Sequence, residues 1–165
     1  YLTPQGKPLN QKRLKSLSNL DNLTILCGRY EGVDERIIRE FVDEEISLGD
    51  YVISGGEIAS MVIIEGITRL LPGVVDDYES INQDSFQKGI LDFPHYTRPD
   101  NIDNHTIPEV LLSGNHTEIK KWRRKQSLGA TWHKRPELLK KVKLSEEDDR
   151  LLKEYISEFK ENGNK

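Results

Sequence analysis

The sequence has 165 residues but only one cysteine, four histidines and no long apolar run. A single cysteine, Cys27, excludes a disulfide framework within the chain and is typical of a protein in a reducing cytoplasm. No apolar stretch approaches the roughly 20 residues that a membrane-spanning helix needs, and no signal peptide is predicted. The histidines have no zinc-ligand spacing. These features predict a cytoplasmic protein that does not enter a membrane.

Two common nucleotide-binding motifs are also absent. There is no Gly-x-x-x-x-Gly-Lys-Ser/Thr, which excludes a P-loop, and no Gly-x-Gly-x-x-Gly after a strand, so a nicotinamide dinucleotide fold has no support. The glycines occur instead in two turns, "CGRYEG" (27–32) and "SLGDYVISGG" (47–56). In an open α/β sheet, such turns gather at the carboxyl ends of the strands, where ligands bind. The pattern predicts a backbone-lined pocket for a nucleoside-like ligand.

Strands and helices alternate in the first half of the sequence. Apolar patterns predict strands at 23–27 and 51–53, an extended segment at 45–48, and helices at 35–42 and 54–71. Asp34 is the predicted N-cap of the first helix, and Ser54 with Glu57 forms a predicted capping box for the second. Because the second helix is apolar around most of its circumference, we expect most of its surface to be buried. The alternation predicts an α/β fold with a mostly parallel sheet.

The second half is helical and basic. Helices are predicted at 117–126, 136–141 and 145–160, the last capped by Ser145 and Asp148. Residues 31–92 contain 15 Asp or Glu against four Lys or Arg, whereas residues 115–143 contain ten Lys or Arg against two Glu. This asymmetry predicts two functional regions, of which the second meets a polyanion. The predicted organisation is a pocket-bearing domain at 1–75, a polar acidic linker at 76–91 and a helical domain at 92–165.

The most basic stretch is "EIKKWRRKQSLGATWHKRPELLKK" (118–141). Cations interleaved with Trp122 and Trp132 are typical of surfaces that contact phosphates and bases. The alternative is a solvated helix face with both tryptophans in the core. We interpret the tryptophans as core residues and the cations as functional, because few acids lie among the cations to pair with. The predicted phosphate contacts are Lys120, Lys121, Arg123, Arg124 and Lys125.

Six longer stretches carry a resemblance to a known family. They are "LCGRYEGVDER", "SLGDYVISGGE", "LPGV", "DSF", "FPHYTRP" and "LLSGNHTEIKKWRRKQSLGATW". In this order, and from "YLTPQG" to about Leu152, the chain resembles the bacterial tRNA (guanine-N1-)-methyltransferases of the TrmD type. The family carries a segment before its match to Tyr1, and "YLTPQGKPL" is typical of the middle of a protein, so we expect the front of the chain to be missing.

The resemblance implies an activity and an assembly. The activity is methyl transfer from S-adenosylmethionine to N1 of the guanosine at position 37 of tRNA. The implied fold is an α/β trefoil-knotted parallel sheet of the SPOUT class with a small helical C-terminal domain that binds tRNA. The implied assembly is a homodimer with its active site at the subunit interface. A requirement for Mg²⁺ stays open.

The resemblance also implies roles for particular residues. Asp84 would be the general base for the N1 proton, acting from the other subunit, and Arg69 would stabilise charge on O6. The cofactor would be held by Thr3, Pro4, Gly28, Tyr30, Glu31, Leu48, Gly49, Asp50, Tyr51, Val52, Ile53, Gly55 and Gly56. Expected tRNA contacts are His95, Arg98, Ser113, Asn115, Lys121, Arg123 and Arg124. No metal ligands are assigned, although the Glu31 carboxylate could face either the cofactor's amino group or a metal.

Purely structural interpretations of the same residues also stay open. Without the resemblance, a structural ion pair explains Arg69 equally well, and Asp84 is better explained as the N-cap of a short turn at 85–89. A second function is also open, in which the chain is a catalytically inactive tRNA-binding fragment. Binding of S-adenosylmethionine discriminates between the two functions.

Overall fold

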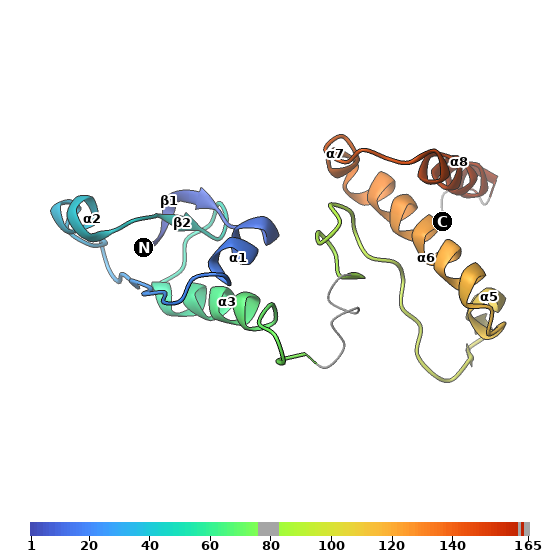
Figure 1. The fold of residues 1–165 in the computed structure, drawn as a ribbon, viewed down its shortest axis with the longest axis horizontal. Helices are drawn as coiled ribbons and strands as arrows, with labels where there is room; N and C mark the ends of the chain where they lie inside the picture. Colours follow the sequence, from blue (N-terminus) through green and yellow to red (C-terminus); the bar gives the residue numbers. More distant parts are fainter. Residues whose placement is uncertain (76–82, 162, 164–165) are drawn as a thin grey trace. The chain divides into compact units, whose positions relative to one another are not determined.

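The computed structural model describes residues 1–75, 83–161 and 163. The chain divides into two compact units, Tyr1–Ile81 and Asn82–Lys165 (Figure 1). Each unit has a buried hydrophobic cluster of its own. None of the helices in the described part of the chain is both long and apolar enough to cross a membrane.

In its described residues, the first unit combines a small parallel sheet with three helices. Its elements are β1 (Leu2–Pro8), α1 (Gln11–Leu17), α2 (Glu35–Phe41), β2 (Ile46–Ser47) and α3 (Gly56–Thr68). Strands β1 and β2 pair in parallel, which confirms the predicted α/β class. The Asp34 side chain accepts a hydrogen bond from the Arg36 backbone N–H (2.9 Å), so the predicted cap of α2 is confirmed.

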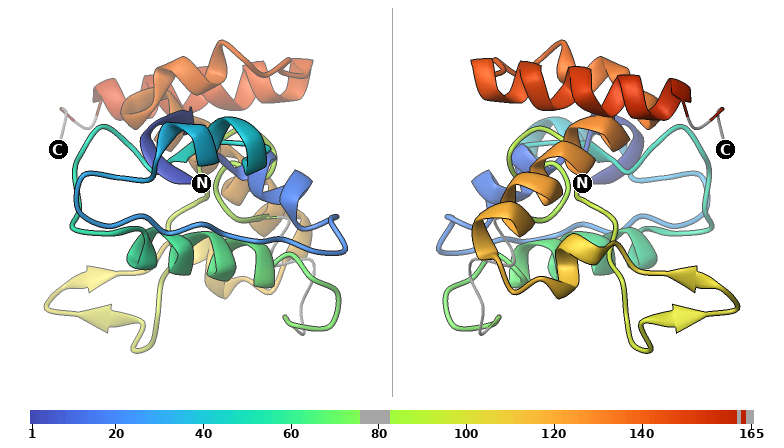
Figure 2. Two further views of the ribbon diagram at one scale, coloured as in Figure 1. Left: turned by 90° about the vertical axis from the view of Figure 1, so that its left-hand side faces the viewer. Right: turned by 90° about the vertical axis from the view of Figure 1, so that its right-hand side faces the viewer.

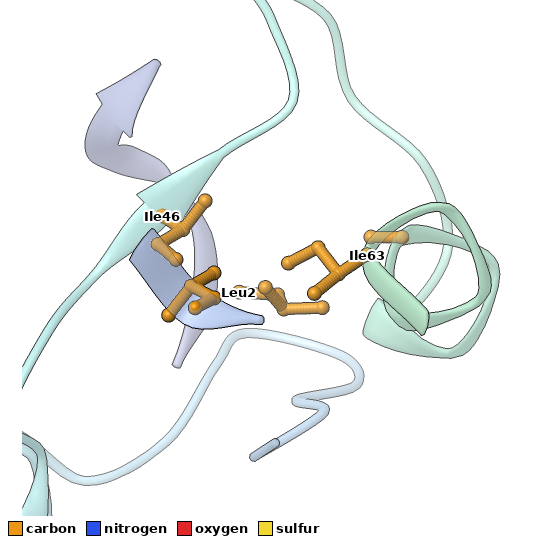
Figure 3. Close-up of a cluster of buried hydrophobic side chains, with 5 residues drawn as sticks. Leu2, Ile46 and Ile63 are labelled. Atoms are coloured by element: carbon orange, nitrogen blue, oxygen red, sulfur yellow. The ribbon is translucent and has the colours of Figure 1, made fainter. Parts of the chain in front are cut away.

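The core of this unit lies between the sheet and α3. Leu2 and Ile46 extend from the strands toward Ile63 of α3, which is almost fully buried (Figure 3). Burying an isoleucine side chain to this extent stabilises a fold by about 1.5–3 kcal/mol. Gly6 allows the two strands to meet, because a Cβ at this position would collide with the backbone of Ile46.

The two predicted strands at 23–27 and 51–53 do not form. In the first, only Cys27 makes a bridge, in parallel with Leu2. In the second, the chain turns tightly at Gly49, whose φ is +153°, and the Tyr51 N–H donates to the Gly49 carbonyl (3.0 Å). Residues 51–53 are exposed and line a pocket instead.

Helix α3 differs from its prediction at both ends. Its N-cap is Gly55, which makes no side-chain hydrogen bond, so the predicted capping box of Ser54 and Glu57 is wrong. Glu57 instead accepts a hydrogen bond from the Arg29 guanidinium (2.6 Å). A charged donor offers a carboxylate a stronger hydrogen bond than a backbone N–H does. The helix also ends at Thr68, three residues earlier than predicted.

The predicted burial of α3 is wrong as well. Only Gly56, Ala59 and Ile63 of this helix are buried. Ile58 and Met61 are each 66% exposed, and Ile64 is 54% exposed. The reason is geometric: the sheet and α1 cover one side of the helix, and no described element of this unit covers the opposite side.

The second unit is mainly helical. Its elements are β3 (Asn101–Ile102), β4 (His105–Thr106), α5 (Glu109–Leu112), α6 (His116–Lys134), α7 (Pro136–Leu139) and α8 (Glu146–Glu161). The β3–β4 hairpin leads directly into α5, and α6 and α8 pack side by side (Figure 2). All three predicted helices are present, although α6 continues to Lys134, beyond its predicted end at 126. The Asp148 N–H donates to the Ser145 hydroxyl (3.1 Å), which confirms the predicted cap of α8.

The core of the second unit forms where α6 meets α8. Leu128 and Leu151 are almost fully buried, and Gly129 brings the helices close because a Cβ there would collide with the Tyr155 ring. Ile90 is buried in the same cluster, although its position falls within the predicted linker at 76–91. Residues 76–82 of that linker lie outside the described residues.

Candidate functional sites

A pocket of about 350 Å³ opens in the first unit. Its wall consists of four stretches, at 1–5, 28–33, 45–49 and 51–56, together with Glu35, Ile38 and Ala59. Both glycine-bearing turns of the sequence contribute to it. Pockets for small molecules and cofactors in proteins usually have volumes of about 300–1,000 Å³.

The pocket brings together almost all the residues predicted to hold the cofactor. Of these, Asp50 alone does not line it. The lining residues are Thr3, Pro4, Gly28, Tyr30, Glu31, Leu48, Gly49, Tyr51, Val52, Ile53, Gly55 and Gly56. Residues that sequence reasoning missed include Ser47 and Gln5, which carry polar groups into the same wall.

The two glycine turns contact each other directly. The Gly56 N–H donates to the Gly28 carbonyl (3.0 Å), and Arg29 makes an antiparallel bridge with Gly55. A Cβ on Gly56 would lie 2.8 Å from the Cα of Cys27, which is backbone and cannot move aside. A Cβ on Gly55 would meet only the side chains of Glu57 and Arg29. Gly56 is therefore the glycine that this close approach requires.

Charged side chains line the pocket or lie next to it, and Arg29 of the wall pairs with Glu57. The hydrogen bond from Arg29 lowers the pKa of Glu57 below its ordinary value, so this carboxyl is ionised at neutral pH. Glu31 and Tyr30 are exposed on the adjacent turn, and Tyr30 has a φ of +57°. The acidic side chains of the pocket wall can attract a ligand that has a cationic group.

The predicted catalytic residues, Arg69 and Asp84, belong to different units. Arg69 is the C-cap of α3 and is exposed. Asp84 is half-buried and precedes a turn in which the Gln87 N–H donates to the Asp84 carbonyl (3.3 Å). Each of the two side chains interacts with at least one other group. Their catalytic roles stay predictions.

Two of the predicted phosphate-binding cations form ion pairs with α8. Arg124 donates two hydrogen bonds to Asp148 (2.7 and 2.9 Å), and Lys125 donates to both oxygens of Glu158 (2.8 and 3.0 Å). The interpretation that the basic stretch lacks acidic partners is therefore wrong for Arg124 and Lys125. Their partners lie 24 and 33 residues away in the sequence, beyond the stretch in which acids were counted.

The other predicted tRNA contacts have varied surroundings. The Asn115 side chain caps α6 by accepting from the Thr117 and Glu118 N–H groups (3.2 and 3.3 Å). The Ser113 hydroxyl accepts from the Asn115 N–H (3.1 Å). One ring nitrogen of His95 lies 2.8 Å from a carboxylate oxygen of Asp92. The remaining residues of this set are Arg98, Lys121 and Arg123, of which Arg98 is exposed.

The Arg124–Asp148 pair yields a prediction about stability. Replacing Arg124 by Ala should destabilise the second unit by about 1–3 kcal/mol, because the buried Asp148 carboxylate loses its charged partner. The hydrogen bonds from Arg124 lower the pKa of Asp148 to about 2. Because this folded pKa lies below the unfolded value near 4, the contribution is fully present above about pH 4 and is lost toward pH 2.

Thermal unfolding followed by circular dichroism at pH 7 and pH 3 measures this effect. We expect Arg124→Ala to unfold at a lower temperature than the parent at pH 7, with a smaller gap at pH 3. Arg150→Ala is the control, since the nearest carboxylate oxygen, on Glu147, is 3.9 Å away and both side chains are exposed. Equal melting temperatures for Arg124→Ala and the parent would contradict a structural role.

The fold and the sites define a class of protein, an α/β ligand-binding unit joined to a basic helical unit. Residues 1–141 match the family model described as tRNA (Guanine-1)-methyltransferase TrmD. The chain is 54% identical over 158 residues to the tRNA (guanine-N(1)-)-methyltransferase of Vibrio vulnificus strain YJ016, covering 96% of this chain and 64% of the relative. It is 52% identical over 160 residues to that of Photobacterium profundum, covering 97% and 64%.

The chain belongs to the tRNA (guanine-1)-methyltransferase family of the TrmD type. It spans about 64% of the length of these curated relatives.

Proposed function

We propose that this protein transfers a methyl group from S-adenosylmethionine to N1 of the guanosine at position 37 of tRNA. One observation carries the proposal: nearly all the residues expected to hold the cofactor line a single pocket, in a chain that belongs to this family. Relatives that are more than half identical to it are named tRNA (guanine-N(1)-)-methyltransferase. Since tRNA is a cytoplasmic molecule, we infer a cytoplasmic protein.

The pocket suits S-adenosylmethionine in size and chemistry. Gly28 and the pocket-lining residues of segment 48–53 offer backbone N–H and carbonyl groups to an adenine, and the hydrogen bond from the Gly56 N–H to the Gly28 carbonyl joins the two turns. Glu31 in the pocket wall offers a negative charge to the cationic amino group. When bound, S-adenosylmethionine supplies an electrophilic methyl group. The task of the protein is then to position the guanine and to move its proton.

The acid–base step falls to Asp84 and Arg69. Guanine N1 carries a proton at neutral pH and is a poor nucleophile, so a base must remove that proton as the N–C bond forms. In this proposal the Asp84 carboxylate accepts the N1 proton, and the Arg69 guanidinium stabilises the negative charge that develops on O6. The electron pair left on N1 forms the new bond to the methyl carbon as the bond from that carbon to the sulfonium sulfur breaks, and the sulfur keeps this electron pair and departs as the neutral thioether S-adenosylhomocysteine.

We further propose a homodimer of trefoil-knotted SPOUT-type subunits, with Asp84 acting on the pocket of the other subunit and the helical unit binding tRNA. The exposed apolar side of α3, with Ile58, Met61 and Ile64, supports an assembly of this kind. Exposed apolar patches on soluble proteins commonly mark interaction surfaces.

The resemblance leaves open whether the reaction requires Mg²⁺. Among residues 1–75, 83–161 and 163, no group of three or more His, Cys, Asp or Glu side chains is placed to hold a metal ion.

Methyl transfer to matched tRNA transcripts tests the proposal. The full-length protein is incubated with S-adenosylmethionine carrying a labelled methyl group and with transcripts that differ only in G37 or A37. We expect label in the G37 transcript alone. Salt-sensitive tRNA binding with no label, and no heat when the cofactor is titrated in a calorimeter, would support the alternative of a catalytically inactive tRNA-binding protein.

A further inference from the structure

An aromatic and cationic surface lies on the second unit, where the segment 90–96 runs along α6 (Figure 1). The Leu91 N–H donates to the Thr131 hydroxyl (2.9 Å). Further along, the Arg123 guanidinium lies 4.8 Å above the Phe93 ring. These two contacts attach the segment to α6 and lead it toward the helix N-terminus, where Tyr96 is placed beside Trp122.

Tyr96 presents an aromatic ring to solvent. The residue is 47% exposed, and its ring centroid lies 6.3 Å from that of the half-buried Trp122, with the planes inclined at 53°. A base inserted between two rings needs about 7 Å between parallel planes, twice the contact distance of carbon atoms. The two rings therefore leave no room for a base between them, and the exposed part of Tyr96 is the surface that remains for stacking, with Trp122 as its aromatic neighbour.

Trp132, the other tryptophan of α6, has no such role. It packs edge-on against Phe159 of α8 at 5.8 Å, as expected of a core residue. The two tryptophans of α6 therefore differ: Trp132 joins the helices, whereas Trp122 supports an exposed ring.

The cations of α6 that remain available lie on the same helical turn as Trp122. Lys120 is exposed and Lys121 is half-buried, and neither forms an ion pair with any carboxylate of the described residues. Arg124 and Lys125 are engaged with α8. The Nε of Arg123 is buried and has no hydrogen-bond partner among the described side chains and backbone groups. Unpaired positive charge is thus left on the turn of α6 that carries Trp122.

We propose that Tyr96, supported by Trp122, is a stacking platform for an unpaired base of RNA, with Lys120 and Lys121 binding the adjacent phosphates. Exposed aromatic rings among unpaired cations favour single-stranded nucleic acid, since every base offers a π face and every nucleotide a phosphate. That the RNA is tRNA rests on the proposed function. The platform itself adds Tyr96 and Trp122 to the residues expected to bind it.

Affinity measurements on Tyr96 variants test the platform. The parent and each variant are titrated with tRNA and with an unstructured RNA heptamer at several salt concentrations. Tyr96→Ala should weaken binding about 5- to 150-fold, the range for loss of one stacked base. Tyr96→Phe should bind within about twofold of the parent, because the ring is retained. Ile102→Ala, which removes a 52% exposed apolar side chain from the same unit, should have no effect.

Salt dependence separates stacking from charge. Tyr96→Ala should leave the slope of log affinity against log salt unchanged, since no phosphate contact is lost. The double variant Lys120→Ala/Lys121→Ala should reduce the slope by up to about two units. If the slope of the lysine variant is unchanged, Lys120 and Lys121 do not bind phosphates, and this part of the proposal is wrong.

A second substitution distinguishes a base from an apolar partner. Tyr96→Leu keeps an apolar side chain but loses the π face, so we expect it to bind as weakly as Tyr96→Ala. If Tyr96→Leu binds RNA as the parent does, the stacking platform is overturned, and a protein partner becomes the better explanation of the exposed ring. This variant also carries the test if Tyr96→Ala proves unfolded by circular dichroism.

Different results would contradict the stacking platform and the proposed function. A parent that methylates tRNA, with Tyr96→Ala binding tRNA equally well, overturns the platform and leaves the function. A parent that binds the heptamer in a Tyr96-dependent way but transfers no methyl group to G37 overturns the function and supports the platform.

Discussion

Replacing Asp84 by Asn is expected to slow methyl transfer by about two to four orders of magnitude, the usual contribution of a general base. The amide has nearly the same shape as the carboxylate and still accepts a hydrogen bond, but it cannot take the N1 proton. Affinities for tRNA and S-adenosylmethionine should therefore stay close to those of the parent. Single-turnover rates in the full-length protein, with the RNA in excess of its dissociation constant, measure the chemical step alone.

Two further variants test whether the loss of rate is specific to Asp84. Asp100→Asn removes an exposed carboxylate from the same unit and should leave the rate unchanged. Arg69→Ala should slow the reaction to a similar extent as Asp84→Asn for a different reason, because the charge on O6 loses its partner. The combined effect of the Asp84 and Arg69 changes should be less than additive, since both act on one transition state.

Mixed dimers test whether Asp84 acts across the subunit interface. Subunits carrying Asp84→Asn are mixed with subunits carrying a defective cofactor pocket. If the base acts on the partner's pocket, one site of each mixed dimer receives both defects and the other receives neither, so part of the activity returns. If the rate of Asp84→Asn is within a few-fold of the parent's, Asp84 is not the general base, and Glu31 is the first other carboxylate to test.

Replacing Gly56 by Val is expected to abolish binding of S-adenosylmethionine. The new side chain would meet the backbone of Cys27, so the two glycine turns would have to separate, and their contact forms one wall of the pocket. Overpacking of this kind also destabilises a fold by about 1–3 kcal/mol. Calorimetric titration with the cofactor measures the loss, which we expect to exceed 100-fold, and thermal unfolding measures the destabilisation.

The neighbouring glycine provides the control. Gly55→Ala meets only the flexible side chains of Glu57 and Arg29, and the extended φ of −173° at Gly55 suits any residue. Of these two adjacent glycines, Gly56 is the one at which an added Cβ would lie closest to backbone. If the Gly56→Val protein folds and binds the cofactor normally, the cofactor does not bind in this pocket.

Local features were predictable because their partners lie within a few residues. Asp34 caps α2 through Arg36, and Ser145 caps α8 through Asp148, so both helix starts could be found in a short window of sequence. The membership of the pocket was predictable for another reason. The long motifs around the two glycine turns resemble a family, and that resemblance supplied the residues without any geometry.

Tertiary structure decided whatever depends on distant partners. Arg124 and Lys125 looked unpaired because the acids that bind them lie on α8, and Glu57 left its expected cap for Arg29, 28 residues away. The exposure of α3 was equally hidden, since hydrophobic periodicity tells which residues favour burial but not whether another element covers them. Sequence by itself therefore determined the caps of α2 and α8 and the presence of α2, α3, α6, α7 and α8, because these depend on residues close together in the chain. Packing between elements decided which charges are engaged and which faces are left open, because ion pairs and burial require two surfaces to meet.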